Sequence, residues 1–202
     1  MARSVQQPRP YRKQRRAQSE ADTRRRITEA TVTLHREIGP AKTTISAVAE
    51  RAGVQRLTVY RHFPDEAGLI GACSALWRAS HPAPDPSPWI AIDDPEERLR
   101  AALAGLYAFY RGDAAMVANI RRDAPVVPAL AAVTSDLPVY FAAVRDVLAR
   151  GWGARGRRRT LLLAALGHVI EFETWRSLEL GQGLAPEAAV ELAVRAVRAA
   201  TS

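Results

Sequence analysis

The sequence of 202 residues contains a single cysteine, Cys73, which excludes an internal disulfide and a cysteine-cluster metal site. Such cysteine usage is typical of the reducing cytoplasm, where we expect the protein. Long apolar runs are missing too: the longest, residues 101–110 and 124–133, fall short of the roughly 20 residues that span a bilayer. The first residues carry no apolar run behind their charges, so neither a membrane span nor a secretory signal is expected.

Motifs that support catalysis or hold a cofactor are also lacking. The sequence has no glycine-rich phosphate loop, nucleophile elbow or paired-histidine motif, and its four histidines lie far apart, at His35, His62, His81 and His168. His168 and Glu171 are three residues apart, but no further histidine or cysteine is placed to complete a metal site. We therefore expect no enzyme, no cofactor and no bound metal.

Acidic residues are scarce in the first two fifths of the chain. Residues 1–80 hold 15 Lys+Arg against 7 Asp+Glu, whereas residues 81–202 hold 14 of each, so the whole net charge of +8 lies in the N-terminal part. Clustered cations gain binding free energy on a polyanion by releasing counterions. This distribution predicts a nucleic-acid-binding N-terminal module, while a solvated basic tail at residues 1–20 is an alternative source of part of the excess.

The hydrophobic pattern predicts an all-α protein, because runs of alternating β-branched residues are absent. We expect four segments: a flexible basic arm at 1–21, an N-terminal helical domain at 22–80, a proline-rich extended connector at 81–94, and a C-terminal helical domain at 95–202. Helices are expected at residues 22–38, 45–52, 55–62, about 65–80, 95–111, 113–122, 126–134, 136–150, 157–180 and 186–199. Thr44, Asp94 and Asp136 are the expected N-caps.

Two of these helices, at residues 45–52 and 55–62, have the spacing of a helix-turn-helix. Ala49 is small where the second helix must cross the first, and Gly53 permits the positive φ of the turn. A shared apolar seam comes from Val48, Val54 and Val59. An ordinary pair of antiparallel helices has the same spacing, but the adjacent charge excess favours a DNA-binding domain.

A set of short motifs runs through residues 22–75: Thr43-Thr44-Ile45, Val48-Ala49, Arg51-Ala52-Gly53-Val54, Thr58-Val59-Tyr60, His62-Phe63 and Leu69. In order and spacing, these motifs resemble the DNA-binding head of the TetR family of bacterial transcriptional regulators. The remainder of the chain is similar to the family in length and helical character only.

The resemblance implies that residues 55–62 form the recognition helix. Base edges would then be contacted by Gln55, Arg56 and Arg61, with arginine best suited to guanine, and Leu57 would meet a thymine methyl. Phosphate contacts are implied for Thr44, Thr58, Tyr60 and His62. Phe63 is expected in the core, and for Tyr60 a partly buried position is the alternative.

Three positions depart from the family pattern. Gln55 stands where Ser or Thr is frequent and is a weak N-cap, and Leu57 replaces a commonly small residue. Glu66 replaces a frequent lysine, which puts one phosphate contact in doubt. Arginines in residues 12–16 and 24–26 could offset that loss through phosphate or minor-groove contacts, and a solvated position is the alternative for them.

The expected helix at residues 157–180 carries two apolar stripes: Leu161, Ala165, His168, Phe172 and Trp175 on one, Leu163, Leu166, Ile170 and Leu178 on the other. A helix that is apolar nearly all round must be covered on nearly all sides. With the apolar residues of 186–199, this predicts a homodimeric four-helix seam, which the resemblance also implies. A two-fold dimer would place its recognition helices about 34–36 Å apart and read a palindromic operator.

A small-molecule effector is the other expected partner. Aromatic and polar side chains in otherwise Ala/Leu/Val surroundings suit a mostly apolar pocket: Tyr107, Tyr110, Asn119, Tyr140, His168, Phe172 and Trp175. The resemblance implies an inducer pocket in this domain, although ordinary core packing produces the same pattern.

We therefore expect a homodimeric, ligand-responsive repressor that leaves its DNA site when a largely apolar effector binds. Two alternatives stay open. One is a sequence-nonspecific DNA-binding protein whose affinity comes from the basic arm. The other is a small-molecule-binding or enzymatic α-bundle with a vestigial DNA-binding head.

Overall fold

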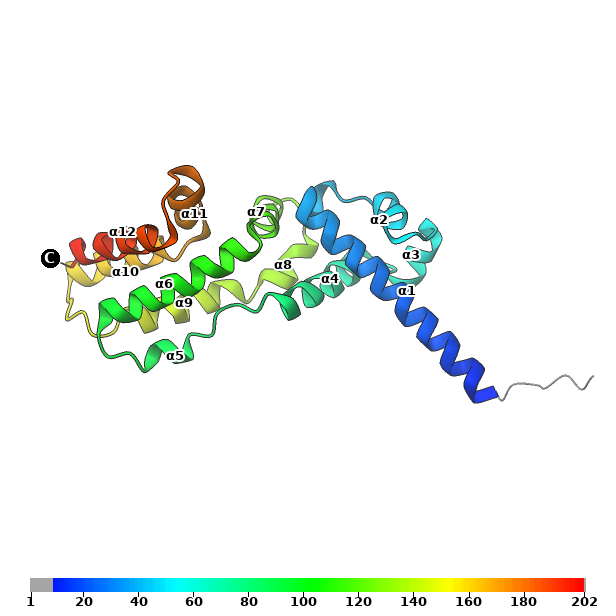
Figure 1. Ribbon diagram of the computed structural model, residues 1–202, viewed down its shortest axis with the longest axis horizontal. Helices are drawn as coiled ribbons and strands as arrows, with labels where there is room; N and C mark the ends of the chain where they lie inside the picture. Colours follow the sequence, from blue (N-terminus) through cyan, green and yellow to red (C-terminus); the bar gives the residue numbers. More distant parts are fainter. Residues whose placement is uncertain (1–8, 202) are drawn as a thin grey trace, which may run out of the picture. The chain divides into compact units, whose positions relative to one another are not determined.

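The computed structural model describes residues 9–201, with side chains from residue 13 onward. Within this range the regular elements are helices and no strand occurs, which confirms the all-α class (Figure 1). The chain divides into two compact units. We call residues 9–80 with 119–133 the first unit, and residues 81–118 with 134–201 the second unit.

The first unit is built around a long N-terminal helix. Its elements are α1 (Arg9–Glu37), the 3-10 turn η1 (Pro40–Lys42), α2 (Ile45–Ala52), α3 (Arg56–His62), α4 (Glu66–Ser80), the end of α7 (Ala114–Asp123) and most of α8 (Ala129–Thr134). Helix α1 packs against α2 and α4. The core between these helices consists of buried apolar residues that recur at helical spacing, among them Ile27, Leu34, Val48, Val59, Phe63 and Leu69.

Helix α1 begins at Arg9 instead of residue 22, so the expected flexible arm is wrong for residues 9–21. The side chains from residue 13 to Ala21 are exposed, so this extension buries no apolar face. Pairs one helical turn apart support it, since Arg16 Nε lies 3.1 Å from Glu20 Oε1 and Gln18 donates to Asp22 at 3.1 Å. Residues 1–8 of the expected arm lie outside the described residues.

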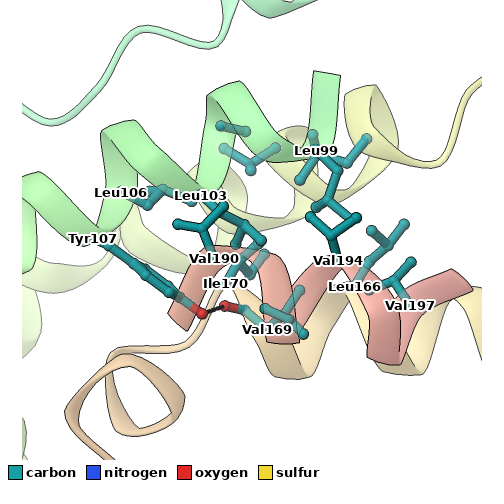
Figure 2. Close-up of a cluster of buried hydrophobic side chains, with 14 of the residues drawn as sticks. Leu99, Leu103, Leu106, Tyr107, Leu166, Val169, Ile170, Val190, Val194 and Val197 are labelled. Carbon is teal, nitrogen blue, oxygen red and sulfur yellow. Dashed lines mark hydrogen bonds between the residues drawn. The ribbon is translucent and has the colours of Figure 1, made fainter. Parts of the chain in front are cut away.

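The second unit contains a helical core formed mainly by α6, α10 and α12. Its elements are α5 (Ser87–Ile90), α6 (Pro95–Gly112), the start of α7, α9 (Leu137–Leu148), α10 (Arg157–Val169), α11 (Phe172–Trp175), the π-helical turn η2 (Arg176–Gly181) and α12 (Pro186–Ala199). Figure 2 shows leucines of α6 facing valines of α12, with Leu166 and Val169 of α10 beside them. The N-cap of α6 is Asp94, as expected, and its side chain accepts from Glu97 N at 2.8 Å.

The expected single helix at residues 157–180 is wrong, because α10 ends at Val169 and Glu171 has an extended backbone (ψ 143°). The hydroxyls of two tyrosines of α6 stabilise this break. Tyr107 donates to Val169 O at 2.9 Å, drawn in Figure 2, and Tyr110 donates to Ile170 O at 2.7 Å. Carbonyls at a helix end need such external donors when they are buried.

Two smaller expectations also differ from the structure. The proline-rich stretch 81–94 is not extended throughout, since α5 forms within it and Trp89 is buried against α6, close to Gly105. Asp136 precedes α9 but makes no side-chain cap hydrogen bond. None of the described helices is both long enough and apolar enough to cross a membrane.

Candidate nucleic-acid interface

Helices α2 and α3 form the helix-turn-helix that the sequence predicts. Thr44 caps α2, because its hydroxyl accepts from Ala47 N at 3.1 Å. Gly53 ends α2 in the left-handed region (φ 64°), which glycine adopts without steric cost. Gln55 precedes α3 and makes no side-chain cap hydrogen bond, as expected for this residue. Packing of the buried Val59 and Phe63 therefore positions α3.

The opposite face of α3 is open to solvent. Leu57 is 76% exposed and Tyr60 is 44% exposed, and Gln55, Arg56 and Arg61 are exposed beside them. Neither Arg56 nor Arg61 has a hydrogen bond or ion pair with another described residue. Of the other predicted DNA contacts, Thr44 is exposed, whereas Thr58 and His62 are half-buried. The predicted base-contacting residues are thus all accessible to solvent.

Two arginines of α1 donate hydrogen bonds to the C-terminal ends of α2 and α3. Arg24 Nη1 donates to His62 O at 2.6 Å, and its guanidinium lies 4.0 Å from the centroid of the Phe63 ring. Arg26 Nη1 donates to Ala52 O at 3.2 Å. Cations at a helix C-terminus also offset the partial negative charge there. Sequence reasoning left residues 24–26 either in contact with DNA or solvated, and missed this positioning role.

His62 lies half-buried at the C-terminal end of α3, near the charges of Arg61 and Arg24. Its pKa is lowered from 6.5, first by burial and then by the charges of Arg61 and Arg24. Its Nε2 atom is buried with no hydrogen-bond partner among the described residues.

The end of α7 braces the C-terminal end of α1 within the first unit. Asn119 Nδ2 donates to His35 O at 3.0 Å and to Arg36 O at 2.8 Å. Arg122 donates to Ile38 O at 3.0 Å, and Asp123 accepts from Ala41 N at 3.0 Å. Asn119 was expected in an effector pocket, and here it satisfies the last carbonyls of α1.

Four of the expected effector-binding residues meet in the second unit. The ring centroids of Tyr110 and Phe172 are 5.5 Å apart, and Trp175 lies 5.9 Å from Tyr110 and 5.3 Å from Phe172. Tyr107 is fully buried nearby on α6. These four side chains belong to the hydrophobic core of the unit.

The remaining expected effector contacts are dispersed. Tyr140 is half-buried on α9 and donates to Pro84 O at 2.8 Å. Burial raises the pKa of the Tyr140 hydroxyl to about 12. His168 is exposed on α10, and Asn119 belongs to the first unit.

Glu179 is a polar group of the second unit that sequence reasoning missed. Its side chain is 6% exposed, and its Oε2 atom lies 3.1 Å from Arg111 Nε. Glu179 Oε1 and Trp175 Nε1 are buried without a hydrogen-bond partner among the described residues. The two residues are four apart along the continuous α11 and η2 turns, a spacing that brings side chains together. The sequence carries no local signal for this burial.

Clusters of three or more His, Cys, Asp or Glu side chains able to hold a metal ion do not occur within residues 9–201. Buried Cys73 lies with its Sγ 3.4 Å from His35 Nδ1. Burial raises the pKa of the Cys73 thiol to about 12 and lowers that of His35 to about 4, so both groups are neutral at pH 7.

Comparisons with known proteins agree with this arrangement. A family profile described as "Bacterial regulatory proteins, tetR family" matches residues 27–73. Among solved structures, a proposed fatty acid metabolism regulator of Clostridium perfringens has a TM-score of 0.59 at 15% identity, and the match covers 86% of this chain and 97% of that one. A TetR-like transcriptional regulator from Rhodococcus sp. RHA1 has a TM-score of 0.56 at 19% identity, covering 87% and 93%. No curated protein sequence matches the chain. At these identities the structural matches show a shared fold.

Proposed function

We propose that this chain, whose residues 27–73 match the profile of the tetR family of bacterial regulatory proteins, is a homodimeric repressor of a palindromic DNA site. The exposed face of α3 carries the proposal. Arg56 and Arg61 extend from a helix whose buried side is fixed by Val59 and Phe63. Two unpaired guanidiniums on a fixed helix suit bidentate contacts to guanine in the major groove.

The direct test presents the purified protein with random DNA duplexes at about 0.15 M salt, where nonspecific phosphate binding is weakened. Sequencing of the retained duplexes should reveal one palindrome with half-sites about one helical turn apart. No enrichment, together with binding that disappears as salt rises, would favour the nonspecific DNA-binding alternative. That alternative draws on the exposed basic residues near the start of α1, such as Lys13 and Arg16.

Homodimerisation is proposed through α10 and α12. Leu161 on α10 is 47% exposed and Leu192 on α12 is 49% exposed, and these two helices pack against each other in the second unit. Large apolar side chains on adjacent helices favour burial against a second copy.

The effector is proposed to bind beside the aromatic cluster of the second unit. Trp175 Nε1 is a buried donor and Glu179 Oε1 a buried acceptor, so a hydroxyl on a largely apolar molecule would satisfy both atoms. Binding would favour a dimer geometry that no longer fits adjacent major grooves. A panel of small phenols and alcohols should contain compounds that release the selected duplex from the wild type but not from Trp175→Phe. Equal release from both proteins would remove Trp175 from the site.

A further inference from the structure

The first unit contains a cavity whose lining includes one predicted phosphate contact, Tyr60, and none of the predicted base contacts. Its volume is about 220 Å³, and its lining residues come from α1, η1, α2, α3 and the start of α4. Val48, Phe63 and Leu69 are buried lining residues, whereas Asp65 and Glu66 are exposed ones. The lining therefore runs from the core to the surface, and the cavity is accessible from solvent.

The volume of the cavity suits a small aromatic ligand. An apolar protein cavity of about 150 Å³ is large enough to bind benzene. The present cavity, at about 220 Å³, has room for one aromatic ring with a short substituent. Apart from His35, its buried walls are aliphatic and aromatic, which favours an apolar ring.

The charges around the cavity favour a positively charged substituent on the ring. No lysine or arginine lines it, although the first unit as a whole is basic, and both carboxylates of the lining, Asp65 and Glu66, belong to its exposed part. Asp65 Oδ1 accepts from Gly68 N at 2.7 Å, which fixes the carboxylate at the start of α4. His35 at the buried side adds no positive charge, because burial keeps it neutral at pH 7. The cavity thus combines an apolar interior with a negatively charged rim.

We propose that this cavity binds a small monocyclic aromatic amine, with the ring among Val48, Phe63 and Leu69 and the ammonium group at Asp65 and Glu66. The site is separate from the effector site proposed in the second unit. It does not depend on whether the first unit binds DNA.

The test is a titration of the full-length, isotopically labelled protein with three probes of one shape: benzylamine, benzyl alcohol and benzoate. Backbone amide shifts report which residues each probe affects. Benzylamine should shift amides of the lining residues, with a Kd of about 1 mM for a ligand of this size. Benzyl alcohol should bind several-fold more weakly, and benzoate more weakly still, because the rim attracts only the cation.

Variants that remove charge measure how much the rim carboxylates contribute to binding, apart from the site of the ring. The double variant Asp65→Asn, Glu66→Gln keeps side-chain size and an N-cap oxygen at position 65. It should bind benzylamine and benzyl alcohol with the same affinity. Glu50→Gln, which removes an exposed carboxylate of α2 outside the lining, should leave the difference between the two probes unchanged.

A pair of variants that each add a phenyl ring tests where the ring of the probe binds. Ile45→Phe adds bulk to a half-buried lining residue and should abolish the shifts, whereas Ser46→Phe adds the same ring at an exposed neighbour and should retain them. If Ile45→Phe does not fold, the rim variant still decides the proposal. Shifts that map to the second unit, or equal affinity for all three probes in the wild type, would overturn it. Loss of DNA binding has no bearing on these readouts.

Discussion

Arg24 shows how one side chain links two helices of the first unit. It donates to the last carbonyl of α3 and covers the Phe63 ring, so a residue of α1 fixes the end of α3. Arg25, next to it, makes only a pair with Glu29 on the helix surface, 2.8 Å long. Adjacent arginines therefore differ in function according to the helix face on which they lie.

Arg24→Ala should lower the free energy of unfolding by about 1–2 kcal/mol, because it removes a hydrogen bond to a helix end and a cation–π contact. Arg25→Ala should change it little, since exposed pairs of this kind contribute weakly. Urea unfolding of both variants measures the difference. Equal loss in the two variants would contradict the positioning role of Arg24.

His35 makes the stability of the first unit sensitive to acid. Its pKa is about 4 in the folded state, because burial opposes the charge and nearby Asp123 only partly compensates, against 6.5 for the exposed group. Between these values the unfolded chain binds a proton that the folded protein does not. This contribution is therefore present above pH 6.5 and is lost as the pH falls toward 4.

From about pH 7 to about pH 5, protonation of His35 in the unfolded chain should remove about 2 kcal/mol of stability. His35→Gln should lack this part of the pH dependence, and His168→Gln, at an exposed position, should keep it. Denaturant unfolding at the two pH values checks this. Parallel pH profiles for all three proteins would show that His35 is not the responsible group.

Among the helices, the boundary between α10 and α11 depends on residues remote in sequence. At this break, the hydroxyls of Tyr107 and Tyr110 on α6 donate hydrogen bonds to the carbonyls of Val169 and Ile170. The following η2 turn is π-helical and places Glu179 in a nearly buried position. The second unit thus uses polar groups of buried aromatic residues to interrupt a helix.

Tyr110→Phe should destabilise the protein by about 1–3 kcal/mol, because it leaves Ile170 O without its donor in a buried environment. Tyr140→Phe is the matched comparison, since its hydroxyl bonds to Pro84 O at a half-buried position and should cost less. Thermal or urea unfolding distinguishes them. A larger loss for Tyr140→Phe would contradict the account of the break.

Local signals were sufficient for the helix-turn-helix and insufficient for this break. Thr44, Gly53 and Asp94 act through neighbours within four residues, so sequence spacing predicts their roles. The apolar period of residues 157–180 continues across Glu171, and nothing local indicates that α6 supplies hydroxyls there. Arg24 and Asn119 were likewise recognised as polar residues, but their carbonyl partners lie 38 and more than 80 residues away.

For the whole molecule, the two units carry different proposed tasks. The first unit has the exposed face of α3, and it includes residues 119–133, which follow α6 and the first half of α7 in the chain. The second unit has the aromatic cluster and the exposed leucines of α10 and α12. DNA contact, effector binding and dimerisation are thereby assigned to separate surfaces.

Leu161→Glu and Leu192→Glu should each convert the proposed dimer to monomer, because a carboxylate in an apolar interface is strongly unfavourable. Val139→Glu, at a 72% exposed position of α9, should remain dimeric. Light scattering after size-exclusion chromatography measures the mass. A dimer in all three variants would place the interface elsewhere, and a monomeric wild type would exclude it.

Recognition of bases by α3 is tested by the affinity of Arg56→Ala for the selected duplex and for its single-base-pair variants. We predict a loss of about 5- to 150-fold on the selected duplex, with relaxed preference at one base pair and unchanged preference elsewhere. A uniform loss on every duplex would reassign Arg56 to phosphate binding. Unchanged affinity on all of them would contradict recognition of bases by this residue of α3.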